Sequence, residues 1–199
     1  MTHPDTITHT RGFDLDRVTA LYTELLYALG EDPDREGLKG TPGRVAAWWR
    51  EFLGHDAGRT DTVFTQHLAH GSAHLVVVRG ITAWSLCEHH LLPMRLDMTI
   101  GVRPDGGKVL GLSKFSRIVA AHAHRLQLQE RIVDGVAADI VTTLGTPDVG
   151  VVAEGRHLCM QMRGVREQQA SVLGYSFAGA FEREGALGDR LLTLAGAHT

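Results

Sequence analysis

The two cysteines of the chain each lie close to histidines, and these residues have the types and spacing of metal ligands. Cys87 and His90 are separated by two residues, a common spacing for two ligands on one turn, and His89 lies between them. His157 and Cys159 form a second Cys/His pair much later in the chain. Thiolate and imidazole ligands favour zinc over magnesium or calcium. The pattern therefore predicts a zinc site with five candidate ligands.

Two alternatives to a catalytic zinc site stay open at this point. A disulfide would use both cysteines, but it leaves the neighbouring histidines unexplained, and a cytosolic chain normally keeps its thiols reduced. A closed structural zinc site takes four protein ligands, whereas a catalytic site usually takes three and keeps one position for water. Zinc lowers the pKa of a bound water to about 7, and histidines off the metal can carry protons at that pH. The pattern favours a hydrolase.

A second candidate site, for an anion, lies where Ser113, Lys114 and Arg117 enter a predicted helix. Backbone amides at a helix N-terminus favour an anion, and residues three apart share one helix face. Arg163, four residues after Cys159, and Arg44 are further candidates for this pocket. Taken alone, Lys114 and Arg117 are more typical of a solvated basic turn. The metal motif favours the pocket.

Glu130 is a candidate for reading a purine base. A carboxylate can accept two parallel N–H bonds, as the N1 and N2 edge of guanine offers. The residue lies between two predicted helices, where a glutamate is also favoured simply by the helix dipole. The sequence by itself favours this second interpretation.

The spacing of apolar residues predicts the elements that position these groups. Helical spacing indicates helices over 14–29 and 41–54, with Asp14 and Thr41 as N-caps, and two more helices from 113 and over 129–144. Strand patterns occur at 74–84, 98–103, 149–154 and 171–181. This order predicts an α+β fold, with an antiparallel sheet, a helix pair on one face and an N-terminal helical extension.

The same patterns divide the chain into four parts. We expect a flexible N-terminal arm, a helical module, a catalytic domain and a C-terminal tail, over residues 1–12, 13–60, 61–185 and 186–199. A chain of 199 residues suits one domain with such an extension.

Composition excludes several classes of function. The chain is 43% hydrophobic, carries a formal net charge of −3, and has no long run of Lys or Arg, so neither nucleic acid nor an anionic membrane is an expected partner. No segment has the apolar length of a membrane span. Residues 1–11 are polar and lack the apolar core of a secretory signal, so we expect a cytoplasmic protein.

Several motifs together, in this order, resemble the GTP cyclohydrolase I family over roughly residues 15–182. They are LGEDP at 29–33, REGL at 35–38, TPGRVA at 41–46, CEHHLLP at 87–93, GLSK at 111–114, QER at 129–131 and HLCMQMRGV at 157–165. The segments after Pro93 and after Val165 depart from the family pattern, since residues 94–102 lack its usual aromatic residues and residues 170–177 lack most of its hydroxyls.

The resemblance implies the tunnelling fold, with a homo-oligomeric ring of two stacked pentamers and active sites at subunit interfaces. It also implies a role for each matching residue. Zinc would be held by Cys87, His90 and Cys159, and the acid/base pair would be His89 and His157. Ser113 would serve proton transfers at the ribose. The ribose triphosphate would be bound by Ser113, Lys114, Arg117, Arg163 and Arg44, and the guanine by Glu130. Gln129 would also bind the substrate.

The implied reaction is zinc-dependent conversion of GTP to 7,8-dihydroneopterin triphosphate, the first step of folate and pterin biosynthesis. Hydrolysis opens the purine at C8 and releases this carbon as formate, after which the ribose rearranges and a new ring closes. Two alternatives remain. One is a divergent paralogue that opens the imidazole ring of GTP or of another purine nucleotide in a specialised pathway. The other is a non-catalytic, zinc-stabilised, nucleotide-binding ring protein.

Overall fold

The computed structural model describes residues 12–65, 74–105 and 107–196. The chain forms two compact units, and the boundary between them in the sequence lies between His55 and Asp56. We expected this boundary at residue 60. The expected arm at 1–12 lies, except for Gly12, outside the described residues. In the described part of the chain, the helices are all too short or too polar to cross a membrane.

The N-terminal unit contains helices α1 (Leu15–Ala28) and α2 (Thr41–Leu53). Asp14 caps α1 as predicted, because its carboxylate accepts a hydrogen bond of 2.9 Å from the Arg17 amide. Thr41 is not the cap of α2. The helix begins at this residue, and Gly40, whose φ of 77° favours glycine, is the N-cap. The two helices are joined by a hydrogen bond of 2.6 Å from Trp49 Nε1 to the Tyr22 hydroxyl.

The second unit is built on a five-stranded sheet with the order β5-β2-β3-β6-β7. Neighbouring strands are antiparallel except for β5, which runs parallel to the end of β2. The bounds are β2 Val76–Cys87, β3 Pro93–Val102, β5 Leu126–Gln127, β6 Val149–His157 and β7 Val172–Ala178. Strands β1 (Val63–Thr65) and β4 (Lys108–Leu110) form a separate antiparallel pair. The predicted α+β fold with an antiparallel sheet is confirmed.

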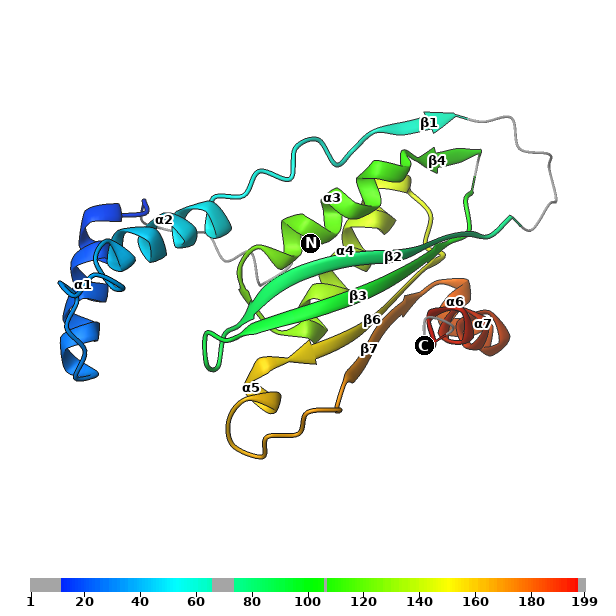
Figure 1. Ribbon diagram of the computed structural model, residues 1–199. Helices are drawn as coiled ribbons and strands as arrows, with labels where there is room; N and C mark the ends of the chain where they lie inside the picture. Colours follow the sequence, from blue (N-terminus) through cyan, green and yellow to red (C-terminus); the bar gives the residue numbers. More distant parts are fainter. Residues whose placement is uncertain (1–11, 66–73, 106, 197–199) are drawn as a thin grey trace. The chain divides into compact units, whose positions relative to one another are not determined.

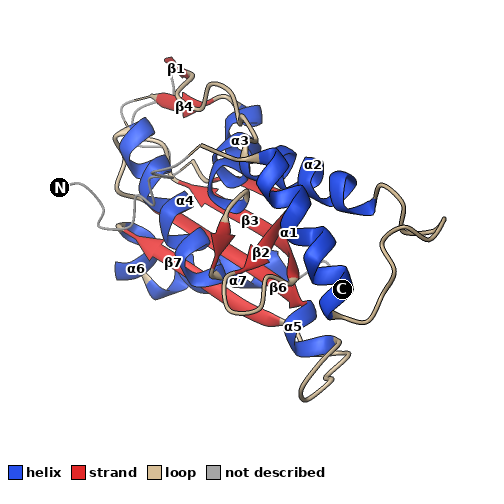
Figure 2. Cartoon of the chain, turned by 90° about the vertical axis from the view of Figure 1, so that its left-hand side faces the viewer, coloured by secondary structure: helices blue, strands red, loops and turns tan. Residues whose placement is uncertain are grey.

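Helices α3 (Leu112–Ala123) and α4 (Gln129–Leu144) cover one face of this sheet (Figure 2). Side chains alternate between the two faces of a strand, so Met94, Leu96 and Met98 of β3 point into the core beneath these helices. Their partners include Ile132, Val136 and Ile140 of α4, which recur at helical spacing. The expected helix pair on one face is therefore present.

The other face of the sheet is partly covered by α6 (Ala180–Arg183) and α7 (Gly185–Gly196) (Figure 1). We expected a tail from residue 186, but α7 is an amphipathic helix, and its fully buried Leu191 packs with Val152 and Phe181. Residues 197–199 lie outside the described residues.

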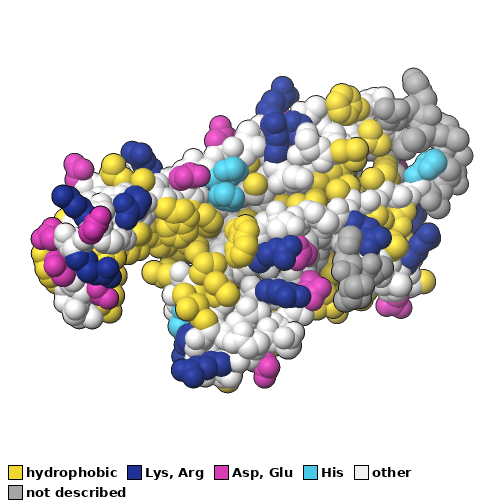
Figure 3. Space-filling view, viewed as in Figure 1, with side chains coloured by type: hydrophobic (Ala, Val, Ile, Leu, Met, Phe, Trp, Pro, Cys, Tyr) yellow, Lys and Arg dark blue, Asp and Glu magenta, His cyan; other side chains and the backbone are white. Residues whose placement is uncertain are grey.

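Beside α7 this face carries charged side chains of both signs next to one another (Figure 3). A cavity of about 410 Å³ lies here, and its charged lining consists of Arg95, Asp97, Glu154 and Arg156. Arg95 and Asp97 form an ion pair of 3.0 Å. None of the candidate site residues lines this cavity.

Candidate metal centre and active site

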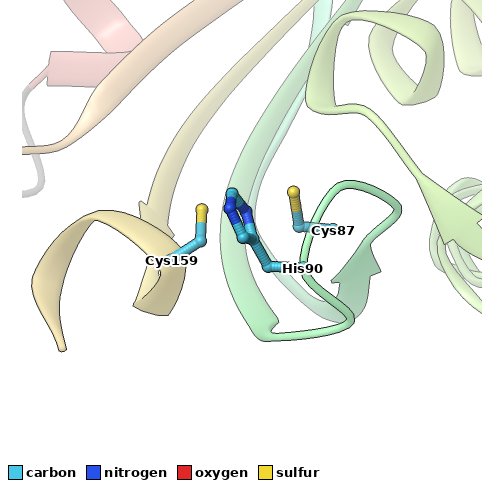
Figure 4. Close-up of side chains that lie close together, drawn as sticks. All are labelled: Cys87, His90 and Cys159. Atoms are coloured by element: carbon cyan, nitrogen blue, oxygen red, sulfur yellow. The ribbon is translucent and has the colours of Figure 1, made fainter. Parts of the chain in front are cut away.

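Cys87, His90 and Cys159 form a compact group of possible metal ligands. Their ligand atoms all lie within 4.8 Å of one another, and Figure 4 shows the three side chains pointing toward one another. Within the described part of the chain, no fourth cysteine, histidine or carboxylate joins this group. Of the five candidates from the sequence, His89 and His157 are therefore outside it.

The geometry of the group follows from two strand ends. Cys87 is the last residue of β2, and the chain then turns tightly, because the amide of Leu91 donates a hydrogen bond of 2.8 Å to the Cys87 carbonyl. Leu91 itself has a φ of 55°, a conformation that is costly for a non-glycine residue, so the turn is held by its surroundings. This turn brings His90 back over Cys87.

Cys159 lies just after β6, which is on the opposite side of β3 from β2. Strand β6 ends at His157, and helix α5 (Leu158–Gln161) begins there. In the sheet register Met94 lies opposite His157, while Leu86 lies opposite Pro93. The ends of β2 and β6 are thus separated only by the start of β3, which brings the two Cys/His motifs together.

The donors suit zinc in type and in spacing. Bond lengths of about 2.0–2.3 Å in a tetrahedral site place ligand atoms roughly 3.3–3.8 Å apart, which is compatible with three ligand atoms that all lie within 4.8 Å of one another. Burial, and next the neighbouring Cys87, raise the pKa of Cys159. Two thiolates at this distance destabilise each other, and a divalent cation between them reverses that effect. Three protein donors leave a coordination position for water, as in catalytic sites.

His157, the last residue of β6 and two residues before Cys159, is half-buried, and its Nε2 atom lies 2.7 Å from Oε1 of Gln129. Burial lowers the pKa of His157, and the charge of nearby Glu130 opposes this effect. Burial thus favours the neutral form of the imidazole. Glu130, in the first turn of α4, is exposed, whereas the adjacent Gln129 is only 1% exposed. The two side chains thus have different surroundings.

Arg163 reaches the same centre, since its Nη1 atom lies 2.9 Å from Nε2 of His90. His89 is exposed, and its ring lies edge-on to that of His90 at a centroid distance of 6.5 Å. The structure therefore gathers five predicted residues around the metal group. They are His89, His157, Gln129, Glu130 and Arg163.

Sequence reasoning missed the ion pair that holds the turn. Glu88 accepts a hydrogen bond of 2.8 Å from Arg131 Nη1, which also donates to Gln127 Oε1 at 3.1 Å. The hydrogen bond from Arg131 lowers the pKa of Glu88 against the opposing effect of burial. The turn after β2 carries His90. These contacts hold that turn against the start of α4. Glu88 and Arg131 both belong to motifs shared with the family, and this was the signal in the sequence that could have indicated their role.

The remaining predicted residues of the second unit lie elsewhere. Ser113, Lys114 and Arg117 are in the first turns of α3, next to β4. The C-terminal end of α3 leads to β5, which pairs with Cys87 (Figure 1). At 1.5 Å per residue, Ser113 is about 15 Å along the helix from the end nearest the metal group. One chain does not bring these residues together with its own metal group.

Arg44 belongs to the N-terminal unit, in the first turn of α2. Its guanidinium donates to Thr41 Oγ1 at 2.6 Å and to the Lys39 carbonyl at 3.3 Å. These contacts orient the side chain along the start of its own helix.

Comparison with known proteins shows extended similarity. The family model for GTP cyclohydrolase I matches residues 18–196. A protein of Hyperthermus butylicus named GTP cyclohydrolase 1 is 45% identical over 175 residues, which cover 87% of each chain. A protein of the same name from Corynebacterium glutamicum is 43% identical over 94% of this chain and 96% of its own length. One from Mycolicibacterium paratuberculosis is 42% identical over 92% and 91%.

Proposed function

The chain belongs to the GTP cyclohydrolase I family, and we propose that it is a zinc-dependent enzyme that converts GTP to 7,8-dihydroneopterin triphosphate and formate. The observation that carries the proposal is the three-donor group of Cys87, His90 and Cys159, with the half-buried His157 at the end of β6, two residues before Cys159. This combination supplies metal ligands and a proton carrier in one place.

Each residue near the metal group has a defined task. Cys87, His90 and Cys159 hold the zinc ion, which when bound supplies the Lewis acidity that activates water for attack on the purine. His157 and His89 carry protons to and from the ring nitrogens and the ribose oxygen. Glu130, exposed at the start of α4, accepts hydrogen bonds from N1 and N2 of guanine and fixes the orientation of the base.

The triphosphate is bound by cations from two chains. Arg163 lies at the metal group of its own chain, whereas Lys114 and Arg117 lie at the far end of α3. A second copy, placed beside the first, brings its Ser113, Lys114 and Arg117 to that site. The edges of the sheet support this arrangement. In the described part of the chain β7 pairs only with β6, and β2 has an outer neighbour only at its last two residues. Such open edges favour pairing with another chain.

Side-by-side pairing of identical chains closes into a ring, and we propose a homo-oligomer of two stacked pentamers. We propose that Ser113, brought to this site by a neighbouring chain, serves proton transfers at the opened ribose. Arg44 completes the set of cations for the triphosphate.

Two inactive variants test whether one site uses two chains. Cys159→Ala removes a metal ligand, and Lys114→Ala removes a phosphate ligand, so each alone should be inactive. Co-expressed, they should regain activity, because about a quarter of randomly assembled sites then contain both native residues. Activity no higher than the sum of the separate variants would show that each site lies within one chain.

Turnover of GTP tests the proposed reaction. The zinc-loaded protein should consume GTP and, after oxidation of the product, give neopterin fluorescence. Chelation should abolish the signal and zinc should restore it. Accumulation of a formylaminopyrimidine, or turnover of another purine nucleotide in place of GTP, would overturn the proposal in favour of a divergent paralogue.

A further inference from the structure

Gln129 is a buried glutamine whose entire amide group is engaged. Its Nε2 atom donates to the Ala153 carbonyl at 3.0 Å and to the Val172 carbonyl at 2.9 Å. Its Oε1 atom lies 2.7 Å from Nε2 of His157. The side chain of Gln129 is thus held between β6 and β7, behind the histidine.

These contacts allow only one orientation of the amide. Rotation by half a turn would place Oε1 against two carbonyl oxygens, which cannot donate, and both hydrogen bonds to these carbonyls would be lost. The atom that faces His157 is therefore an oxygen, which only accepts. It follows that Nε2 of His157 carries the hydrogen. In the neutral ring, Nδ1 then carries the lone pair.

Two glycines make room for this arrangement. A Cβ atom at Gly155 would overlap Oε1 of Gln129 and would lie 2.9 Å from Nε2 of His157. A Cβ atom at Gly174 would lie 3.1 Å from Nε2 of Gln129. Gly155 and Gly174 are in β6 and β7, the two strands that hold the glutamine. The absence of side chains at these two glycines therefore leaves space for the amide against β6 and β7.

We propose that Gln129 is a positioning residue that fixes the ring orientation and the tautomer of His157, so that the histidine exchanges protons with the substrate through Nδ1. This differs from the role of substrate ligand expected for Gln129, since the amide has no N–H left to donate to a substrate. The proposal rests on the proposed function of His157 as a proton carrier.

The test uses Gln129→Met, which keeps the length of the side chain and removes both polar atoms. Gln129→Asn, which withdraws Oε1 by one methylene, is the second variant if the first does not fold. Gln127→Met is the matched control, because Gln127 is also a buried glutamine, 4% exposed, but it bonds to Arg131 and the His122 carbonyl. Solid-state NMR of the zinc-loaded, ¹⁵N-histidine-labelled proteins reports the tautomer, and the His157 signals are those missing in His157→Asn.

We expect His157 to be the pure Nε2–H tautomer in the native protein and in Gln127→Met. It should become a mixture, or Nδ1–H, in the Gln129 variants. A native Nδ1–H tautomer, or variants with an unchanged tautomer, would overturn the inference. The NMR measurement requires no turnover. It therefore tests the effect of Gln129 on the His157 tautomer even if GTP is not the substrate.

Kinetics separate positioning from substrate binding. With GTP, loss of Gln129 should lower kcat at least about 10-fold while KM changes less than about 3-fold, because proton transfer is impaired and binding is not. A raised KM with unchanged kcat would show instead that Gln129 contacts the substrate directly.

Discussion

Replacing Gly155 by alanine tests the packing behind His157. The added Cβ atom would overlap Oε1 of Gln129, a residue that is only 1% exposed and whose amide is held by three hydrogen bonds. Gly155 is not among the residues with positive φ, so backbone strain does not contribute. If Gln129 leaves its place, three hydrogen bonds are lost, at about 1 kcal/mol each, so the free energy of unfolding should fall by about 3 kcal/mol. Turnover should fall with it.

Alanine substitutions at two other glycines give reference values for this loss of unfolding free energy. At Gly174 the added Cβ atom would meet Gln129 Nε2 at 3.1 Å, so Gly174→Ala should cost only about 1 kcal/mol. At Gly185 nothing lies within 4 Å, and Gly185→Ala should keep native stability to within about 0.5 kcal/mol. Urea denaturation at fixed protein and zinc concentrations measures all three. A Gly155→Ala protein as stable as Gly185→Ala would refute the reasoning.

Three further predictions concern the metal, the base and the turn. Cys159→Ala should lose roughly 3–5 kcal/mol of zinc-binding free energy, about a third of the binding free energy of a typical zinc site, because one of three protein ligands is removed. Metal analysis measures the loss of zinc, and the circular dichroism spectrum should be unchanged. Glu130→Gln should lower kcat/KM for GTP about 10- to 100-fold, through loss of charge-assisted hydrogen bonds of about 1.5–3 kcal/mol, without loss of stability. Glu88→Gln should cost about 1 kcal/mol at pH 7. Because Arg131 lowers the pKa of Glu88, this difference should vanish as pH falls below 4.5 through the lowered pKa, in urea titrations across that range.

Local patterns predicted the elements well, because they depend on residues near one another in the chain. Asp14 caps α1 as expected. The second strand was expected over 98–103, whereas β3 already begins at Pro93, so Leu96 of the core lies in a part of the strand that was missed. The pattern for α7 was also available, since Leu187, Leu191 and Ala195 recur every four residues, although we expected a tail there. The first strand was expected to end at residue 84, yet β2 continues to Cys87, so the metal motif begins within a strand.

The site depended on the register of strands far apart in the sequence. Cys87 and Cys159 meet because β2 and β6 both flank β3, which spacing within each motif cannot show. Spacing likewise left His157 as a candidate ligand, whereas its Nε2 atom bonds to Gln129. The burial of Gln129 beside exposed Glu130 follows from the packing of its amide against carbonyls of β6 and β7, a property of the assembled sheet.

The fate of purine C8 tests the central claim most directly. The zinc-loaded protein should be incubated with GTP labelled with ¹³C at C8, and the products followed by NMR. We predict one labelled formate for each 7,8-dihydroneopterin triphosphate formed, with no label in the pterin. Label retained in a nucleotide product, or GTP left intact by the zinc-loaded protein, would contradict the account.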